Sequence, residues 1–195
     1  MINQYFYKAS KKYLSLNSPF LPILLGLFLR LINIYAPLIG VHSWRQSDTA
    51  AIARNFYFNG MSFAYPQIDW GGITGGFVET EFPLYQYLVA LSYKIFGVHD
   101  YLGRGLSVLF SCLTILVLFR LTKKYFNTKV AWWASLFYAF LPLTVYYGRT
   151  IQPESLMILL ATFSLERWIC FLEYKKNRFL LASWIAFTLA VLVKG

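Results

Sequence analysis

Five stretches of the chain are almost continuously apolar, and the charged residues gather in the segments between them. A helix that crosses a lipid bilayer needs about 20 mostly apolar residues, because the hydrocarbon core is about 30 Å thick. The pattern therefore predicts an all-α integral membrane protein. Its expected spans cover about residues 19–37, 102–121, 130–147, 155–172 and 179–193.

Lysine and arginine set the expected orientation. They cluster in an N-terminal arm, residues 1–18, and in the loops after the second and fourth spans. Such clusters stay in the cytoplasm. The rule therefore places the long segment 38–101 and the turn 148–154 on the non-cytoplasmic side.

The beginning of this outer segment has the pattern of a helix. Ser43 followed by Gln46 is typical of a capping box, and Asn59 precedes a glycine at the expected end. Ile52 and Phe56 lie four residues apart, so they share a face. We expect that face to rest on the membrane surface.

A second outer helix is predicted further along. Pro83 suits its first turn, and Gly97 suits its end. The glycine-rich stretch 71–76 before it is a candidate lid over a site. We therefore expect two amphipathic helices along the membrane interface, the second with the apolar stripe Leu84, Leu88, Leu91 and Ile95.

Composition agrees with a membrane protein. The chain is 58% hydrophobic and only 13% charged, which is more apolar surface than a soluble domain can bury. Its net charge of +10, taken alone, is typical of proteins that bind nucleic acid. The basic residues sit mainly in short loops between spans, however, where they set topology, so we expect no nucleic-acid partner.

The acidic residues have the opposite distribution. Of the eight, six fall in the predicted outer segments: Asp48, Asp69, Glu79, Glu81, Asp100 and Glu154. A protein that only sits in lipid has no use for carboxylates gathered on one face. This asymmetry indicates a reaction site at the outer membrane surface.

Asp48 is the candidate catalytic residue. It lies early in the first outer helix, and Arg45 is one turn before it, close enough to pair. A carboxylate held ionised by a nearby cation can act as a general base. The alternative is a helix-start carboxylate that only benefits from the helix dipole.

Other outer carboxylates are candidates for substrate binding. Glu79 and Glu81 are two apart, so in an extended segment they point the same way and can hold sugar hydroxyls or a divalent metal. They can equally be solvated loop acids. Glu154 begins the fourth span, where an acid also suits a helix N-terminus.

Two arginines lie on the outer side, against the usual charge bias. Arg104 opens the second span and Arg149 closes the third. Each can reach lipid phosphates from its span. Alternatively, the guanidinium fork can bind one phosphate of a substrate. His42, Lys94 and Arg45 are further candidates for substrate binding.

The order of these motifs resembles glycosyltransferase family 39. That family includes protein O-mannosyltransferases, the lipid A aminoarabinose transferase and RgtA/B/C/D-like bacterial enzymes, the branch that looks nearest. The resemblance runs over nearly all of residues 20–195. It rests on HSWRQSDTAAIARNF, EFPLYQYLVALSYKIFG, GRGLSVLF and YYGRTIQPESL.

The resemblance implies a multi-span GT-C fold with its active site on the non-cytoplasmic face. Donors would be sugars on polyprenyl phosphate, transferred with inversion. Many members have an acidic pair before a helix that TAAIAR matches. Arg45 and Gln46 occupy the places of that pair, and Asp48 is displaced toward the helix.

Later motifs match as well. Arg104 corresponds to the arginine that opens the family's second span, and EFPLY to its proline-led helix. Glu154 stands where the family often has an aspartate after an arginine, here Arg149. The chain ends at VLVKG, which resembles a mid-protein stretch, so we expect residues 19–195 to be the N-terminal part of a longer transmembrane domain.

We therefore expect an inner-membrane hexosyl- or pentosyltransferase of the cell envelope. It would move a sugar from a polyprenyl-phosphate donor to a glycolipid such as lipopolysaccharide, a polysaccharide or a protein. No cofactor is required by the sequence, and a divalent metal is compatible with it. Two alternatives are a multi-span transporter or lipid flippase, and a non-catalytic assembly partner that keeps the fold.

Overall fold

The computed structural model describes residues 17–40, 42–70, 72–78 and 81–194. Within these ranges the regular structure is helical, apart from one isolated β-bridge between Gln67 and Phe77. The helices are α2 (Phe20–Leu31), α3 (Ser43–Phe58), α4 (Leu84–Phe96), α5 (Asp100–Tyr125), α6 (Thr128–Phe140), α7 (Pro142–Tyr147), α8 (Glu154–Tyr174) and α9 (Asn177–Val193).

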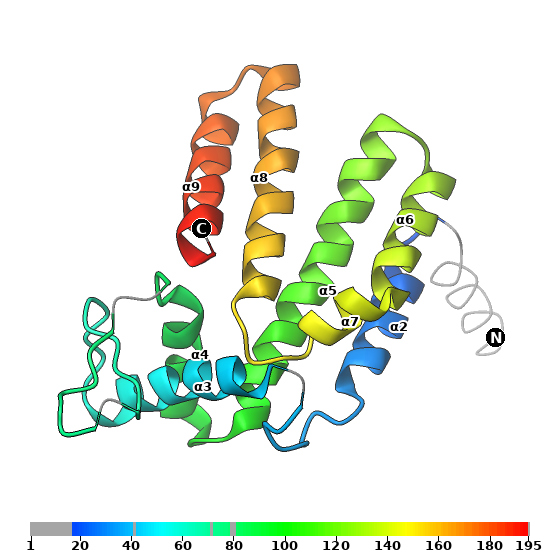
Figure 1. The fold of residues 1–195 in the computed structure, drawn as a ribbon. Coiled ribbons are helices and arrows are strands. Elements are labelled where there is room, and N and C mark those ends of the chain that lie inside the picture. Colours follow the sequence, from blue (N-terminus) through cyan, green and yellow to red (C-terminus); the bar gives the residue numbers. More distant parts are fainter. Residues whose placement is uncertain (1–16, 41, 71, 79–80, 195) are drawn as a thin grey trace, which may run out of the picture.

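The helices separate into a main group around α5 and α8 and a smaller pair, α3 and α4. Helix α8 packs against α5 and α9, while α2 and α6 pack against α5. Helices α3 and α4 pack on each other at one end of this group (Figure 1). The α5–α6 and α8–α9 connections, which hold the basic clusters, lie at the opposite end (Figure 1).

Two of the described helices are long and apolar enough to cross a membrane. They are α5, with 26 residues, and α8, with 21. Together with the helical fold, they support a helical membrane protein. The stretch 19–37 contains a helix of only 12 residues, α2, which spans about 18 Å. The set of five spans and its orientation stay a prediction.

The stretch 130–147 is not one continuous helix, because Pro142 interrupts it. Proline lacks the N–H that would bond the carbonyl four residues earlier, which belongs to Tyr138. Helix α6 therefore ends at Phe140, and α7 begins at Pro142. The break leaves carbonyls at the end of α6 in need of donors.

Arg30 supplies those donors from α2. Its side chain is fully buried, and Nη1 donates to the carbonyls of Gly26 and Ala139, each at 3.1 Å. Nη2 donates to the carbonyls of Tyr138 at 3.4 Å and Thr144 at 3.1 Å. Both terminal nitrogens of Arg30 thus supply donors at the break, which ties α2 to the α6–α7 region.

Helix α3 has the predicted extent but a different start. Its cap residue is His42, in the left-handed conformation with φ of 55° and no side-chain cap bond. The Gln46 N–H bonds the His42 carbonyl at 3.2 Å, and Ser43 is already helical. The predicted capping box at Ser43 is therefore wrong. The helix ends beside Asn59, as predicted.

The apolar face of α3 packs on protein. Ile52 and Phe56 are buried in a cluster with Ile68 and Ala90. The expectation that this face rests on the membrane surface is thus wrong, because α4 and the segment after α3 cover it. On α4, Leu91 and Ile95 remain exposed, while Tyr85, Val89 and Tyr93 face the core.

Tyr85 anchors α4 to α5. Its hydroxyl donates to the Gly103 carbonyl at 2.8 Å and lies 2.8 Å from Ser107 Oγ. Ser107 in turn donates to the Thr150 carbonyl at 2.6 Å, in the turn before α8. Burial raises the pKa of Tyr85 above its usual range, and it raises that of Tyr93 to about 12. Both hydroxyls therefore stay protonated.

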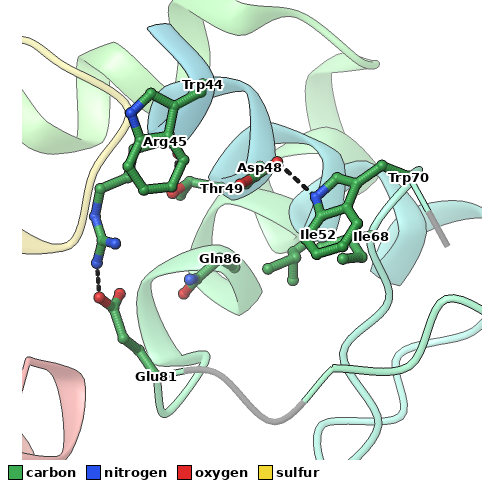
Figure 2. A pocket seen from close by; sticks show the side chains of 9 residues that line it. All are labelled: Trp44, Arg45, Asp48, Thr49, Ile52, Ile68, Trp70, Glu81 and Gln86. Carbon is green, nitrogen blue, oxygen red and sulfur yellow. Dashed lines mark hydrogen bonds and ion pairs between the residues drawn. The ribbon is translucent and has the colours of Figure 1, made fainter. Parts of the chain in front are cut away.

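Segment 66–78 folds back on itself as a short hairpin. The Ile68 N–H bonds the Gly76 carbonyl at 2.9 Å, and the Val78 N–H bonds the Pro66 carbonyl at 3.1 Å. Gly76 has φ of 67°, and a Cβ there would lie 2.5 Å from the Ile68 carbonyl oxygen. Only glycine permits this approach. Residues 72–76, the described part of the candidate lid, thus belong to this hairpin. Trp70, which precedes them, points toward α3 (Figure 2).

Candidate functional site

A cavity of about 430 Å³ lies between α3, α4 and the hairpin. This volume falls in the range of small-ligand pockets, about 300–1,000 Å³. Figure 2 shows its side chains, with Asp48 between two tryptophans. Its lining residues are Trp44, Arg45, Asp48, Thr49, Ile52, Ile68, Trp70, Glu81 and Gln86.

Asp48 is held from the hairpin and not by Arg45. The Trp70 indole N–H donates to Asp48 Oδ1 at 3.2 Å. Arg45 instead forms an ion pair with Glu81, from the segment before α4 (Figure 2). The expected Arg45–Asp48 pair is therefore wrong. The structure nevertheless brings all three predicted residues into one cavity.

A chain of opposite charges extends from this cavity to the start of α8. Glu81 Oε1 lies 2.9 Å from Lys194 Nζ, which lies 3.2 Å from Glu154 Oε1. Glu154 is thus linked to the cavity through Lys194. Sequence reasoning passed over Lys194. The signal was available, because a lysine after the fifth span falls on the predicted outer side, like Arg104 and Arg149.

The two predicted phosphate-binding arginines lie elsewhere, against the segment that follows α2. Arg104 is buried, and it donates to the carbonyls of Asn33 at 3.2 Å and Pro37 at 3.3 Å. Arg149 donates to the Ile32 carbonyl at 3.1 Å. Neither arginine lines the cavity around Asp48.

Two further candidates, His42 and Lys94, do not line the cavity. His42 is the exposed cap residue of α3, and Lys94 is exposed in the last turn of α4. Glu79 lies outside the described residues. In the part of the chain that the structure describes, no three His, Cys, Asp or Glu side chains form a group suited to a metal ion.

Trp70 and Gln86, which line the cavity, were also missed. Nothing local in the sequence marks Trp70, because its partner Asp48 lies 22 residues earlier in the chain. Gln86 is 2% exposed, and its Oε1 has no hydrogen-bond partner among the described residues. A glutamine within the apolar helix LYQYL was the signal for it.

The fold and its two long apolar helices are consistent with a helical membrane protein. The family follows from a direct comparison. Residues 80–195, more than half of the chain, match the model of the dolichyl-phosphate-mannose-protein mannosyltransferase family. The chain belongs to that family, and it is a membrane glycosyltransferase of the GT-C type.

The match confirms the resemblance to glycosyltransferase family 39. It begins at residue 80, so it includes Glu81, Arg104, Arg149, Glu154 and Lys194 but not α3 with Asp48. A search of curated proteins and a search of solved structures each give no match. The role of Asp48 therefore has to be argued from its surroundings.

Proposed function

We propose that this protein transfers a sugar from a polyprenyl-phosphate carrier to an acceptor hydroxyl on the non-cytoplasmic face of the membrane. The acceptor is a glycolipid, a polysaccharide or a protein. The acceptor oxygen attacks the anomeric carbon from the side opposite the phosphate, so the configuration inverts. As the new C–O bond forms, the bond to the phosphate oxygen breaks, and the lipid phosphate leaves with the electron pair.

The observation that supports this proposal best is the position of Asp48. Its carboxylate lines an open cavity, next to the ion pair of Arg45 and Glu81. In the proposed reaction Asp48 takes the proton of the acceptor hydroxyl. A general base must lie within hydrogen-bond reach of that hydroxyl, and the cavity offers room for the acceptor beside it.

The departing phosphate needs positive charge, because its own charge grows in the transition state. Arg149 is the better placed of the two predicted arginines, since its bond to Ile32 lies at an exposed position. Arg104 already uses both terminal nitrogens on backbone carbonyls, in part-buried hydrogen bonds. We therefore assign the direct phosphate contact to Arg149 and a supporting charge to Arg104.

Replacing Asp48 tests the mechanism. Asp48→Asn keeps the side-chain size, and loss of a general base typically costs about 10²–10⁴-fold in rate. Transfer of radiolabelled sugar from a polyprenyl-phosphate donor, measured with the protein in membranes, should fall by that factor. Glu173→Gln removes a carboxylate at the opposite end of α8 and should leave the rate unchanged. Full activity of Asp48→Asn would place the base elsewhere.

The predicted face is tested by labelling. Single cysteines at Thr122 and Asn177, in a background without Cys112 and Cys170, should resist a membrane-impermeant thiol reagent in intact cells. A cysteine at Ser47, exposed on α3, should react. The reverse pattern would put the cavity on the cytoplasmic side and exclude the proposed orientation.

A further inference from the structure

Two tryptophans stand on either side of Asp48 with much of their surface uncovered. Trp44 is 64% exposed and Trp70 is 72% exposed, and both line the cavity. They come from different segments, α3 and the hairpin, so the fold brings them together. Figure 2 shows Asp48 between them. Large aromatic surfaces left uncovered around a carboxylate need a reason, because their exposure to water is unfavourable.

Membrane anchoring does not supply that reason for Trp70. Tryptophans at a membrane interface point their rings toward lipid headgroups. Trp70 instead directs its indole N–H to Asp48, at 3.2 Å, and its ring forms part of the cavity wall. Trp184 on α9 makes the contrast, since it is 61% exposed and lines none of the described cavities.

A pyranose ring fits what the tryptophans offer. One face of such a sugar carries C–H groups with partial positive charge, and an aromatic face carries partial negative charge. The hydroxyls of the sugar point outward from the ring edge. A sugar stacked on Trp70 would therefore lie beside Asp48, because the indole N–H of Trp70 reaches the Asp48 carboxylate at 3.2 Å.

The polar side of the cavity suits the same ligand. Gln86 Oε1 is buried without a partner among the described residues, and an unmade hydrogen bond of this kind is costly. Its oxygen can accept from a sugar hydroxyl, while Arg45 can donate to a sugar oxygen. An extended serine or threonine peptide has no flat C–H face to stack, and it is bound mainly through its backbone groups.

We infer that the acceptor of this enzyme is a carbohydrate, bound by stacking of a pyranose ring on Trp70 with Trp44 as a second aromatic contact beside Arg45, and not a protein hydroxyl. The inference rests on the proposed function of Asp48 as the base. Trp70 and Trp44 fix the plane of the acceptor ring, and Gln86 fixes its rotation. One ring hydroxyl then gives its proton to Asp48 while its oxygen forms the new bond to the donor sugar.

Direct binding tests this inference. The full-length protein is placed in lipid nanodiscs, because sugar-based detergents would compete for the site. Saturation-transfer NMR then titrates methyl glycopyranosides of glucose, galactose and mannose, and a threonine-containing peptide for comparison. At least one glycoside should bind the cavity. Trp70→Ala and Trp44→Ala should each weaken its binding by about tenfold, the loss of one aromatic contact.

Three further variants separate a loss of sugar contacts from a loss of binding caused by misfolding. Trp184→Ala removes an equally exposed indole outside the cavity and should bind as the parent does. Trp70→Phe keeps a ring face but has no N–H, so it should retain most of the sugar binding even if the alanine variant misfolds. Gln86→Leu should weaken binding while the thermal unfolding midpoint stays the same or rises.

Each outcome decides the inference. Peptide binding without glycoside binding, or no glycoside binding at all, overturns it in favour of another acceptor. Equal losses in Trp184→Ala and Trp70→Ala overturn it as well. Asp48→Asn separates the two proposals, because it should bind glycoside normally but transfer nothing. If Asp48→Asn binds glycoside normally and is fully active, the carbohydrate site is supported and only the role of Asp48 as the base is contradicted.

Discussion

The protein contains two regions built around arginine, and they use it in opposite ways. In the cavity between α3, α4 and the hairpin, Arg45 pairs with a carboxylate beside open space and next to Asp48. At the α6–α7 break, Arg30 is fully buried and bonds four backbone carbonyls. A carbonyl partner is part of the chain, whereas a side-chain partner can move away when a ligand arrives.

The difference separates an arginine that holds the fold from one that can exchange its partner for a substrate. Arg104 belongs with Arg30, because its terminal nitrogens bond the Asn33 and Pro37 carbonyls. Arg149 is intermediate, with a bond to the Ile32 carbonyl at an exposed position. The sequence provides only the charge of each arginine and its predicted side of the membrane. These do not tell an arginine with backbone partners from one with a side-chain partner.

Removing Arg30 should have the largest effect. Arg30→Met keeps much of the apolar stem but leaves the carbonyls of Ala139 and Thr144 without this donor. Each buried acceptor left without a hydrogen bond lowers the free energy of unfolding by about 1–3 kcal/mol. We expect a large loss of folded protein, measured as yield and as the thermal unfolding midpoint in detergent. Arg120→Met, at an exposed position near the C-terminal end of α5, should have the yield and unfolding midpoint of the parent. Equal yields and midpoints for the two variants would show that Arg30 contributes no stability through these hydrogen bonds.

Crowding Arg30 should have the next largest effect. A Cβ at Gly148 would lie 2.4 Å from Arg30 Nε and 2.7 Å from Ser111 Oγ. Gly148→Ala should therefore destabilise the protein by about 1–3 kcal/mol, as overpacking does. Gly105 in α5 has no atom within 4 Å of an added Cβ, so Gly105→Ala should be neutral or stabilising by about 0.5–1 kcal/mol. Opposite shifts in the unfolding midpoint check this pair.

The sequence pattern was sufficient where structure is local. Helical spacing and the proline and glycine signals located α4 within a residue at each end, and α3 nearly as well. The stop at Pro142 was missed, because the stretch 130–147 stays apolar across it. Hydrophobicity reports burial in lipid, whereas the break depends on one missing N–H.

The site was predictable only in part, for a physical reason. Asp48, Arg45 and Glu81 were chosen by residue type and side of the membrane, and they do share a cavity. Their pairing was not predictable, since Glu81 and Trp70 reach α3 from distant segments. Residues on one helix compete with such tertiary partners, and here the tertiary partner Glu81 displaced the local one. Lys194 joined the network for the same reason.

Arg149 and Arg104 should give different kinds of loss. Arg149→Gln should raise KM for the polyprenyl-phosphate donor by about tenfold, the loss of one charge-assisted hydrogen bond, without changing the unfolding midpoint. Arg104→Gln should lower the midpoint, since it releases two carbonyls. Arg149→Lys should rescue only partly, because a lysine lacks the fork. Loss of stability in both variants, with unchanged donor KM, would show that both arginines stabilise the fold and do not bind the donor phosphate.

The smallest effect is expected in the charge chain from the cavity to α8. Glu81 and Lys194 are partly exposed, so water screens their attraction, and such pairs contribute about 0.2–1 kcal/mol. A double-mutant cycle with Glu81→Gln and Lys194→Gln measures this coupling in thermal unfolding. Because Glu81 also pairs with Arg45, its replacement should lower transfer more than stability. A coupling above about 3 kcal/mol is typical of buried pairs and would place this network with Arg30, as part of the fold. A weak coupling combined with reduced transfer would show that Arg45 needs Glu81 to stay aligned beside Asp48, and that the two arginine regions differ as described.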